Sequence, residues 1–272
     1  MKAVSPATYT KKYFLTDCEG WDHFQKFKKK KLSPRLSHAA SLLSHPAGKT
    51  ILDFGCGRGE LSAFLLKKKA KLIAVDYSPE ALKLTRETIV TLPSSLQKNI
   101  KIINASAKTL TLPPQSLDAI FFLDVFEHLT NQELDKLLSR FHLWLKPNGQ
   151  LIIHTAPNRL FLLYGYPYFT RFLNLISNPI WKLIFKEKRI TRPSLKSPSD
   201  HLVHINEQTP NTLKTHLNKH HFKAKVWLDS SYQMIRLRDK IHYRLCQPLW
   251  LPYFNRFFHT DIWAIAQKNT VN

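Results

Sequence analysis

The chain has 272 residues, 43% of them hydrophobic, which is enough for one substantial core with further elements attached. Its three cysteines, Cys18, Cys56 and Cys246, have neither the even number of a disulfide framework nor the spacing of a zinc finger. The N-terminus lacks the apolar stretch of a signal peptide, and no apolar run reaches the length of about 18 residues that suggests a membrane span. These features exclude a transmembrane protein and predict a cytoplasmic one.

The charge is strongly basic, with 41 Lys and Arg residues against 19 Asp and Glu residues, for a formal net charge of +22. Lysines cluster at residues 28–31 and 67–69. Such an excess favours anionic partners, which include RNA, anionic lipid and phosphate-bearing substrates. A solvated lysine-rich surface without a partner explains the same composition, so both interpretations stay open. We expect no DNA partner.

Residues 1–49 predict a helical cap in which Tyr9, Tyr13, Trp21 and Phe24 supply aromatic walls to a ligand pocket. After it, the apolar pair Ile51-Leu52 leads into Asp53 and three alternating glycines, Gly55, Gly57 and Gly59. Glycine lets a backbone pass close to a ligand because it has no Cβ atom. A helix that begins near Arg58 would point its free N–H groups at that ligand. This order predicts a strand, a binding loop and a helix.

The spacing of the glycines separates two classes of ligand. Dinucleotide-binding loops have the pattern Gly-x-Gly-x-x-Gly, and here the third glycine comes one residue early. Asp53 stands two residues before the first glycine, where it would repel a pyrophosphate and attract an ammonium group. The loop therefore favours a ligand with an ammonium group.

The next strand, residues 70–76, ends in Asp76, about 20 residues after the glycines, which is the offset of a ribose-binding carboxylate. Ser78 and Pro79 then predict a helix start with Ser78 as its cap. Tyr77 either covers an adenine ring or packs against apolar neighbours. A third strand, residues 100–105, leads to Ser106.

The fourth strand, residues 117–123, runs into Asp124-Val125-Phe126-Glu127-His128-Leu129. Ligands of open α/β sheets bind at the carboxyl ends of the strands, so we expect these side chains to face the reaction site. Residues 146–149, Lys-Pro-Asn-Gly, predict a turn before a fifth strand at residues 150–155. Four repeats of strand and helix predict a parallel sheet.

The glycine loop resembles motif I of the class I S-adenosylmethionine-dependent methyltransferases. The string that begins at Asp124 resembles motif IV of the ubiquinone-biosynthesis O-methyltransferase type, and Leu-Lys-Pro-Asn-Gly before a strand also recurs in the family. The resemblance covers residues 50–157 and implies a Rossmann-like, seven-stranded α/β fold. It implies that S-adenosylmethionine is bound by Asp53, Gly55, Cys56, Gly57, Gly59, Asp76, Tyr77, Ser106 and Asp124. The family usually has an acid where this chain has Ser106, so the hydroxyl or a backbone group would replace it.

Two insertions carry the features that the family resemblance does not cover. Both mix aromatic, leucine and basic residues. The first covers residues 159–188, within a segment at 158–205, and the second covers residues 232–258. They predict either a lid over the active site or a pair of elements that rest on an anionic membrane. The membrane alternative would place the protein at the inner membrane face.

The C-terminal residues 206–272 predict completion of the sheet. A helix over residues 208–220 is followed by a sixth strand at 222–228 and a seventh at 259–267. In the family that the chain resembles, the seventh strand inserts antiparallel beside the sixth.

Methyl transfer needs alignment of the acceptor, and a base if the acceptor is a hydroxyl. His128 and His204 are the candidate bases, because imidazole titrates near neutral pH. Some relatives bind a divalent metal through an acid-x-x-Glu-His string and a distant histidine. Asp124, Glu127, His128 and His204 would be the corresponding ligands, although the first acid of that string is commonly Glu. Our preferred assignment has no metal ligands.

The sequence therefore predicts a methyltransferase that methylates oxygen on a small-molecule, glycan or lipid-linked acceptor. The first alternative is an RNA 2′-O-methyltransferase, which the charge and the metal string favour. The second is a non-catalytic membrane or nucleic-acid adaptor on the same fold, which would have no need of Asp53 and the glycines.

Overall fold

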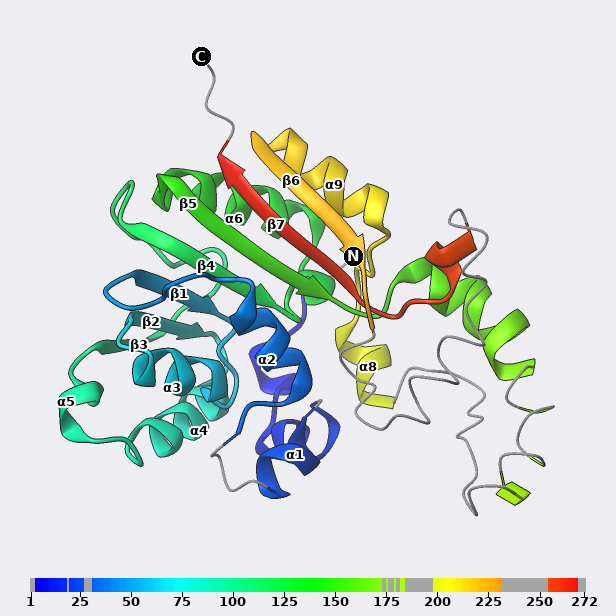
Figure 1. The fold of residues 1–272 in the computed structure, drawn as a ribbon, viewed down its shortest axis with the longest axis horizontal. Coiled ribbons are helices and arrows are strands. Elements are labelled where there is room, and N and C mark those ends of the chain that lie inside the picture. Colours follow the sequence, from blue (N-terminus) through cyan, green and yellow to red (C-terminus); the bar gives the residue numbers. More distant parts are fainter. Residues whose placement is uncertain are drawn as a thin grey trace.

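A computed structural model describes residues 3–18, 20–26, 31–172, 175, 179, 182–183, 198–230 and 254–268. Seven strands form one sheet in the order β3-β2-β1-β4-β5-β7-β6 (Figure 1). The strands are β1 (Thr50–Phe54), β2 (Lys71–Asp76), β3 (Ile100–Asn104), β4 (Leu117–Leu123), β5 (Leu145–Thr155), β6 (Phe222–Leu228) and β7 (Ile262–Lys268). The first five are parallel, and β7 pairs antiparallel with both β5 and β6. The predicted α/β class and the antiparallel seventh strand are confirmed.

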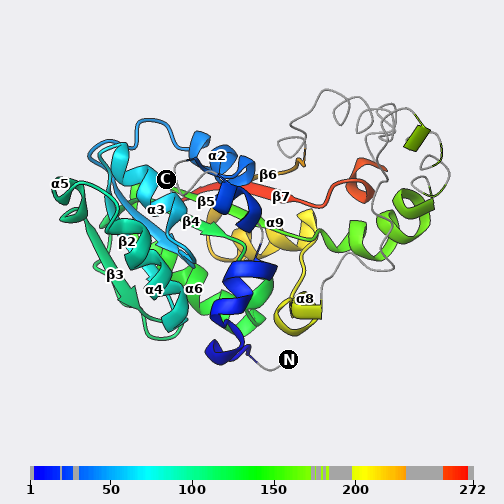
Figure 2. The ribbon, with the colours of Figure 1, turned by 90° about the horizontal axis from the view of Figure 1, so that it is seen from below.

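Helices cover both faces of the sheet because successive side chains of a strand point to opposite sides. On one face, Ile51, Phe121 and Trp263 pack with α2 (Pro34–Ser41) and α3 (Glu60–Lys67). The remaining helices are α1 (Trp21–Lys26), α4 (Pro79–Ile89), α5 (Ser94–Gln97), α6 (Asn131–Trp144), α8 (Pro198–Val203) and α9 (Pro210–Lys219). Figure 2, seen from below, shows α2 on one side of the sheet and α9 on the other.

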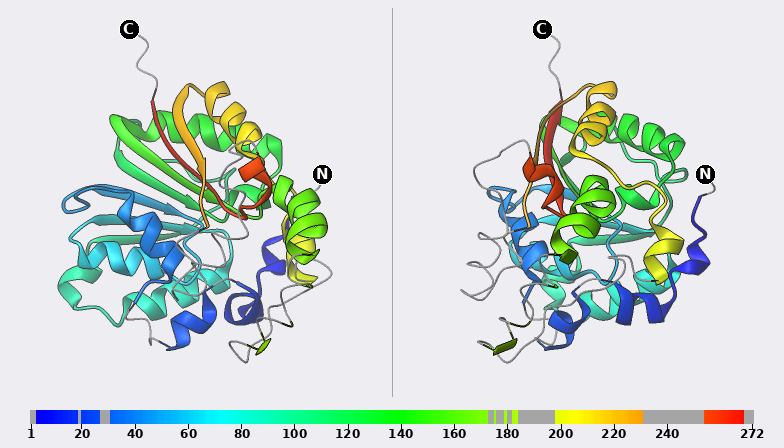
Figure 3. Two further views of the ribbon diagram at one scale, coloured as in Figure 1. Left: turned by 45° about the vertical axis from the view of Figure 1, so that its right-hand side comes forward. Right: turned by 90° about the vertical axis from the view of Figure 1, so that its right-hand side faces the viewer.

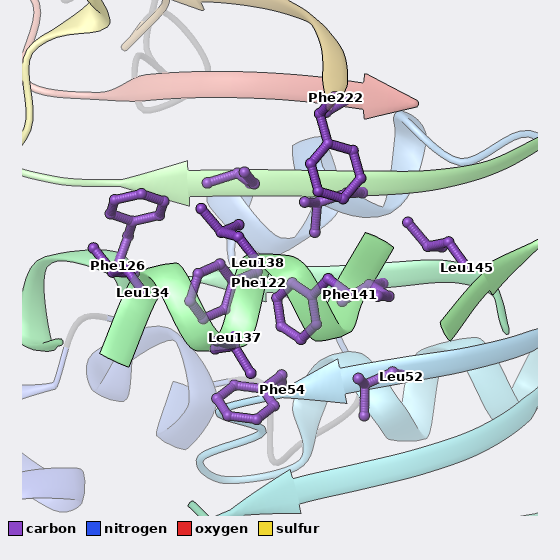
Figure 4. Close-up of a cluster of buried hydrophobic side chains, with 14 of the residues drawn as sticks. Leu52, Phe54, Phe122, Phe126, Leu134, Leu137, Leu138, Phe141, Leu145 and Phe222 are labelled. Atoms are coloured by element: carbon purple, nitrogen blue, oxygen red, sulfur yellow. The ribbon is translucent and has the colours of Figure 1, made fainter. Parts of the chain in front are cut away.

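The larger core lies on the other face, beneath α6 and α9 (Figure 4). Phe122 of β4 meets Phe141 of α6 edge to face at 5.3 Å, and Phe54 of β1 meets both rings at 5.7 Å. Truncating one such buried ring to alanine costs about 3–5 kcal/mol. This cluster fixes the ends of β1 and β4, which carry the glycine loop and the string after Asp124.

Side-chain caps set where several helices begin. Ser78 accepts a hydrogen bond from the N–H of Ala81 and precedes Pro79, as the sequence predicts. Thr130 and Glu133 form a capping box at the start of α6. The helix after the glycine loop begins at Glu60, two residues after Arg58, because Gly59 takes a left-handed conformation with φ of 73°.

The predicted turn at residues 146–149 is instead an irregularity inside a longer strand. β5 begins at Leu145, which pairs with Leu117, and the pairing resumes at Gln150 opposite Ala119. The four residues between them are accommodated as a bulge, which a sequence pattern of turn formers does not distinguish from a true turn.

The N-terminal cap consists of η1 (Pro6–Thr8), η2 (Tyr13–Asp17), α1 and α2. Two short elements, η4 (Phe161–Thr170) and η6 (Phe254–Phe257), lie beyond the carboxyl end of β5, to one side of the sheet (Figure 3). Much of the two predicted insertions lies outside the described residues. Among the described helices, none has the length and hydropathy needed to cross a membrane.

Candidate functional site

The glycine loop lies between the ends of β1 and β2. The N–H groups of Gly55 and Cys56 both donate to the carbonyl of Val75, at 2.8 Å and 3.0 Å. A Cβ atom on Gly55 would overlap the side chain of Val125, and φ at this glycine is 79°. Glycine at position 55 therefore allows the turn after β4 to approach the loop closely. Cys56 is buried, and its Sγ lies 3.5 Å from the Thr85 hydroxyl.

Asp53 lies buried beneath the loop. The Ser62 hydroxyl donates to its Oδ2 at 2.6 Å. Burial raises the pKa of this carboxyl to about 6, and the charge of Asp76 contributes in the same direction. A cation placed at the loop would relieve the cost of ionising Asp53.

Asp76 ends β2 with both of its oxygens held by backbone N–H groups. Gly57 donates to Oδ2 at 3.1 Å, and Ser78 donates to Oδ1 at 2.9 Å. Burial raises the pKa of Asp76 to about 6 despite these hydrogen bonds. The side chain is therefore fixed in orientation, and its remaining lone pairs can accept from hydroxyl groups of a ligand.

Two further predicted contacts have clear local partners. Tyr77 packs edge to face on Tyr9, with ring centroids 5.3 Å apart. The Ser106 hydroxyl accepts from the Lys108 N–H at 3.2 Å and closes the turn after β3. Both remain predicted cofactor contacts.

Asp124 follows β4 with a φ of 54° and is occupied by protein partners. It forms an ion pair with Arg35 of α2, and it lies 2.5 Å from Nδ1 of His154 in β5. The charges of Arg35 and His154 outweigh burial and lower the pKa of Asp124. Its predicted cofactor contact therefore competes with two existing charge pairs.

His154 is completely buried between two carboxylates. Its Nε2 lies 2.9 Å from Asp261 at the start of β7, while Nδ1 faces Asp124. A carboxylate only accepts, so both ring nitrogens must carry protons to bond these partners, and the ring is an imidazolium. Its pKa is raised to about 10, because the two carboxylates outweigh burial.

Glu127, His128 and His204 come together on the other side of Asp124. The His128 and His204 ring centroids are 4.9 Å apart, and His128 Nε2 lies 4.0 Å from Glu127 Oε1. The Thr155 hydroxyl donates to Glu127 Oε2 at 2.7 Å. Burial lowers the pKa of His128 to about 3 and raises that of Glu127 to about 8.

One ligand atom from each of these three residues lies within 4.8 Å of the others, an arrangement that could hold a divalent cation. The sequence alternative also included Asp124, whose carboxylate is instead paired with Arg35 and His154. The structure therefore brings together three of the four residues in that alternative.

The N-terminal cap closes over both halves of the site. The Tyr9 hydroxyl bonds His128 Nδ1 at 2.9 Å, and the Tyr9 carbonyl accepts from the Ser78 hydroxyl at 3.1 Å. Arg58 of the glycine loop donates to the Phe14 carbonyl at 2.9 Å. A crevice of about 190 Å³ remains between this segment and α8, lined by Thr8, Thr10, Lys12, Tyr13, Asp17, Ser199, Leu202 and Val203.

Sequence reasoning missed the partners that reach the site from a distance. Arg35, Arg58, His154 and Asp261 were not among its candidates, and Tyr9 was expected only as an aromatic wall. For His154 and Asp261 the sequence offered one signal. Each is a polar residue near the end of a predicted strand, where open α/β sheets bind their ligands.

Residues 51–149 match the family model of a methyltransferase domain. The chain is 34% identical over 114 residues to a mitochondrial ubiquinone biosynthesis O-methyltransferase of Schizosaccharomyces pombe, which covers 42% of this chain and 40% of the relative. It is 30% identical over 118 residues to phosphoethanolamine N-methyltransferase 1 of Triticum aestivum, or 43% of this chain and 23% of the relative. The chain thus spans less than half the length of these relatives.

Among solved structures, phosphoethanolamine N-methyltransferase 1 of Haemonchus contortus, in complex with phosphoethanolamine and S-adenosylhomocysteine, superposes with a TM-score of 0.60 at 14% identity. The superposition covers 98% of this chain and 49% of that one. The buried acids and the glycine loop, which leaves room for a close ligand, fit the cofactor of this fold. Residues 51–149 therefore form a methyltransferase domain, and the chain has the Rossmann-like fold of the class I S-adenosylmethionine-dependent methyltransferases.

Proposed function

We propose that the protein transfers a methyl group from S-adenosylmethionine to a hydroxyl oxygen of a small-molecule, glycan or lipid-linked acceptor. The observation that carries this proposal is the buried pair of Tyr9 and His128, which contacts Ser78 on one side and Val203, a residue of the crevice, on the other. Burial keeps His128 neutral, and with Glu127 close to its Nε2 to take up the proton, the pair can deprotonate a hydroxyl.

Asp53, Gly55, Gly57, Gly59 and Asp76 would hold the cofactor, which supplies an electrophilic methyl group on a sulfonium. Asp53 would face its ammonium group, and Asp76 would accept from its ribose hydroxyls. The cap segment would exclude water through its contacts with Arg58 and Ser78.

The contacts of His128 favour one tautomer. The Val203 carbonyl, 3.1 Å from Nδ1, can only accept, so it favours a proton on Nδ1. Nε2 then presents its lone pair on the side of Glu127 and is free to accept a proton. With its raised pKa, Glu127 exchanges protons near neutral pH and can share the proton that His128 removes.

The test follows labelled methyl from S-adenosylmethionine into a host lysate separated into lipid, small-molecule, protein and RNA fractions. Label in the lipid or small-molecule fraction supports the proposal. His128→Asn should lower transfer about 100-fold or more, and Tyr9→Phe less, because general base catalysis contributes about 10²–10⁴-fold. His142→Asn, on the half-exposed side of α6, is the matched control. Equal losses in all three variants would contradict the assignment.

A second candidate is N-methylation of a phosphorylated amino alcohol. The relatives from wheat and Haemonchus contortus favour it, because both are named phosphoethanolamine N-methyltransferases. A protonated amine also needs a base, so His128 would keep its role. Incubation of the purified enzyme with phosphoethanolamine distinguishes the two candidates. N-methylated phosphoethanolamine, together with the absence of a labelled ether or ester in the lysate, would select N-methylation.

The RNA alternative predicts label in the RNA fraction that disappears on chelation. In that outcome Glu127, His128 and His204 would act as metal ligands, and a metal would position and acidify the acceptor hydroxyl. The adaptor alternative would gain support if Asp53→Ala abolished cofactor binding and left the cellular function intact.

A further inference from the structure

An exposed aromatic surface lies on η4 (Phe161–Thr170) and on Phe172 just after it, outside the site described above. It consists of Leu163, Tyr164, Tyr168, Phe169 and Phe172, and we call it the aromatic patch. Tyr168 is 70% exposed and Phe172 is 59% exposed. Scattered apolar residues are common on protein surfaces, but several large rings on one short element mark an interaction surface.

The patch is fixed to the body of the protein by the opposite side of η4. Phe161 and Tyr166 are buried there, and Tyr164 and Phe169 reach Phe257 and Phe258 at ring distances of 6.1 Å and 5.6 Å. A Cβ atom on Gly165 would overlap the Phe257 carbonyl, so glycine lets η4 lie directly against η6. The element is thus held with Tyr168 and Phe172, the most exposed rings of the patch, directed to solvent.

Basic residues border the aromatic patch. Arg159 and Arg171 are exposed on the same segment, and Lys182 is exposed further along the chain. Between residues 158 and 197 the sequence contains a single acid, Glu187. Tyrosine and phenylalanine next to Arg and Lys are the composition of surfaces that rest in the headgroup region of an anionic bilayer.

The position of the patch relates it to the site. η4 follows β5 after a few residues, and Thr155 at the end of β5 donates to Glu127. The segment that carries the patch therefore extends from the edge of the sheet at which the acceptor would be methylated (Figure 1). We propose that the aromatic patch binds the surface of an anionic phospholipid bilayer and turns the carboxyl ends of the strands toward it.

The experiment measures co-sedimentation of the full chain with vesicles of phosphatidylcholine alone and with phosphatidylglycerol added. The wild type should bind the anionic vesicles and lose binding as salt is raised. Tyr168→Ser with Phe172→Ser should weaken partitioning roughly tenfold by removing buried apolar area. Arg159→Gln with Arg171→Gln should remove most of the preference for phosphatidylglycerol.

The matched control is Val90→Ser with Leu143→Ser, which removes side chains that are 67% and 51% exposed elsewhere on the surface. It should bind like the wild type. No binding of the wild type to anionic vesicles at low salt would overturn the proposal, as would equal losses in patch and control variants. A wild-type dimer that the patch variant converts to a monomer, with vesicle binding unchanged, would instead make the patch an interface between two copies.

This proposal stands apart from the assigned chemistry. Cofactor binding by calorimetry and methyl transfer to a water-soluble acceptor should be unchanged in the patch variants. If the protein bound vesicles and transferred no methyl group, the membrane-binding role of the aromatic patch would stand and the proposed function would be refuted.

Discussion

Asp53 and Asp76 are two buried acids beside a loop that leaves room for a ligand. Both have a pKa raised to about 6 by burial, so without a cationic ligand these carboxyls are partly protonated near that pH. Because a cationic ligand prefers the ionised form, its binding must displace these protons. If these acids bind the cofactor as proposed, its affinity should depend on pH.

We expect S-adenosylmethionine to bind more weakly as the pH falls through 6. Asp53→Asn should lose roughly 10–100-fold in affinity at neutral pH, since a hydrogen bond to a charged group contributes about 1.5–3 kcal/mol. Titration calorimetry across this range measures both effects. Asp135→Asn, in a partly exposed ion pair with Lys219, is the control and should bind normally. An affinity independent of pH would contradict the role of Asp53.

Glu127 gives a second prediction at the same scale. Burial raises its pKa to about 8, with the charge of Asp124 contributing. If ionised Glu127 and neutral His128 together act as the base, kcat should rise with pH up to about 8 and then level off. Glu127→Gln should remove this rise. A profile that keeps the same midpoint in Glu127→Gln would assign the titration to another group.

At the scale of elements, His154 joins four parts of the fold. Its ring bonds Asp124 after β4 and Asp261 before β7, and Asp124 continues to Arg35 of α2. Ser230, after β6, donates to Asp261 at 2.6 Å. The imidazolium therefore neutralises carboxylates that would otherwise repel each other where the strands meet the site.

The raised pKa of His154 makes stability depend on pH. Its contribution is fully present below pH 6.5, the ordinary value of histidine, and is lost as the pH rises through about 10. The free energy of unfolding, from urea titration, should therefore fall across this range. His154→Gln should lose about 3 kcal/mol near neutral pH, because the buried Asp261 loses its counter-charge and Asp124 keeps only Arg35. His142→Gln should keep the wild-type slope, and a similar slope in His154→Gln would disprove this assignment.

Local sequence patterns predicted a strand or helix well where its own residues determine where it begins and ends. The apolar run at residues 117–123 and the cap at Ser78 match the structure. The start of β5 at Leu145 could not be predicted, because only its pairing with Leu117 makes residues 145–149 part of a strand. His154 and Arg35 stayed hidden for the same reason: their partners lie far away in the sequence.

At the scale of the whole molecule, the net charge of +22 produces a positive field around the protein. Such a field binds polyanions without regard to sequence, through the release of counterions. Charge alone therefore does not favour RNA as the methylated substrate over a phosphate-bearing small molecule.

We expect mixed-sequence RNA to bind at low salt, with an affinity that falls steeply as salt is raised from about 50 to 200 mM. Fluorescence anisotropy measures this, and competing RNA should leave methyl transfer to a small acceptor unaffected at physiological salt. Binding that withstands salt and depends on RNA sequence would contradict this expectation and favour the RNA alternative.

Tyr9 touches both halves of the site through a single residue. Its carbonyl accepts from Ser78, close to Asp76, the proposed partner of the ribose, and its hydroxyl bonds His128. A cofactor that settles against Asp76 would therefore also set the position of the base before an acceptor arrives. The kinetic consequence is a compulsory order of addition, in which S-adenosylmethionine binds first and S-adenosylhomocysteine leaves last. S-adenosylhomocysteine should therefore compete with S-adenosylmethionine and not with the acceptor.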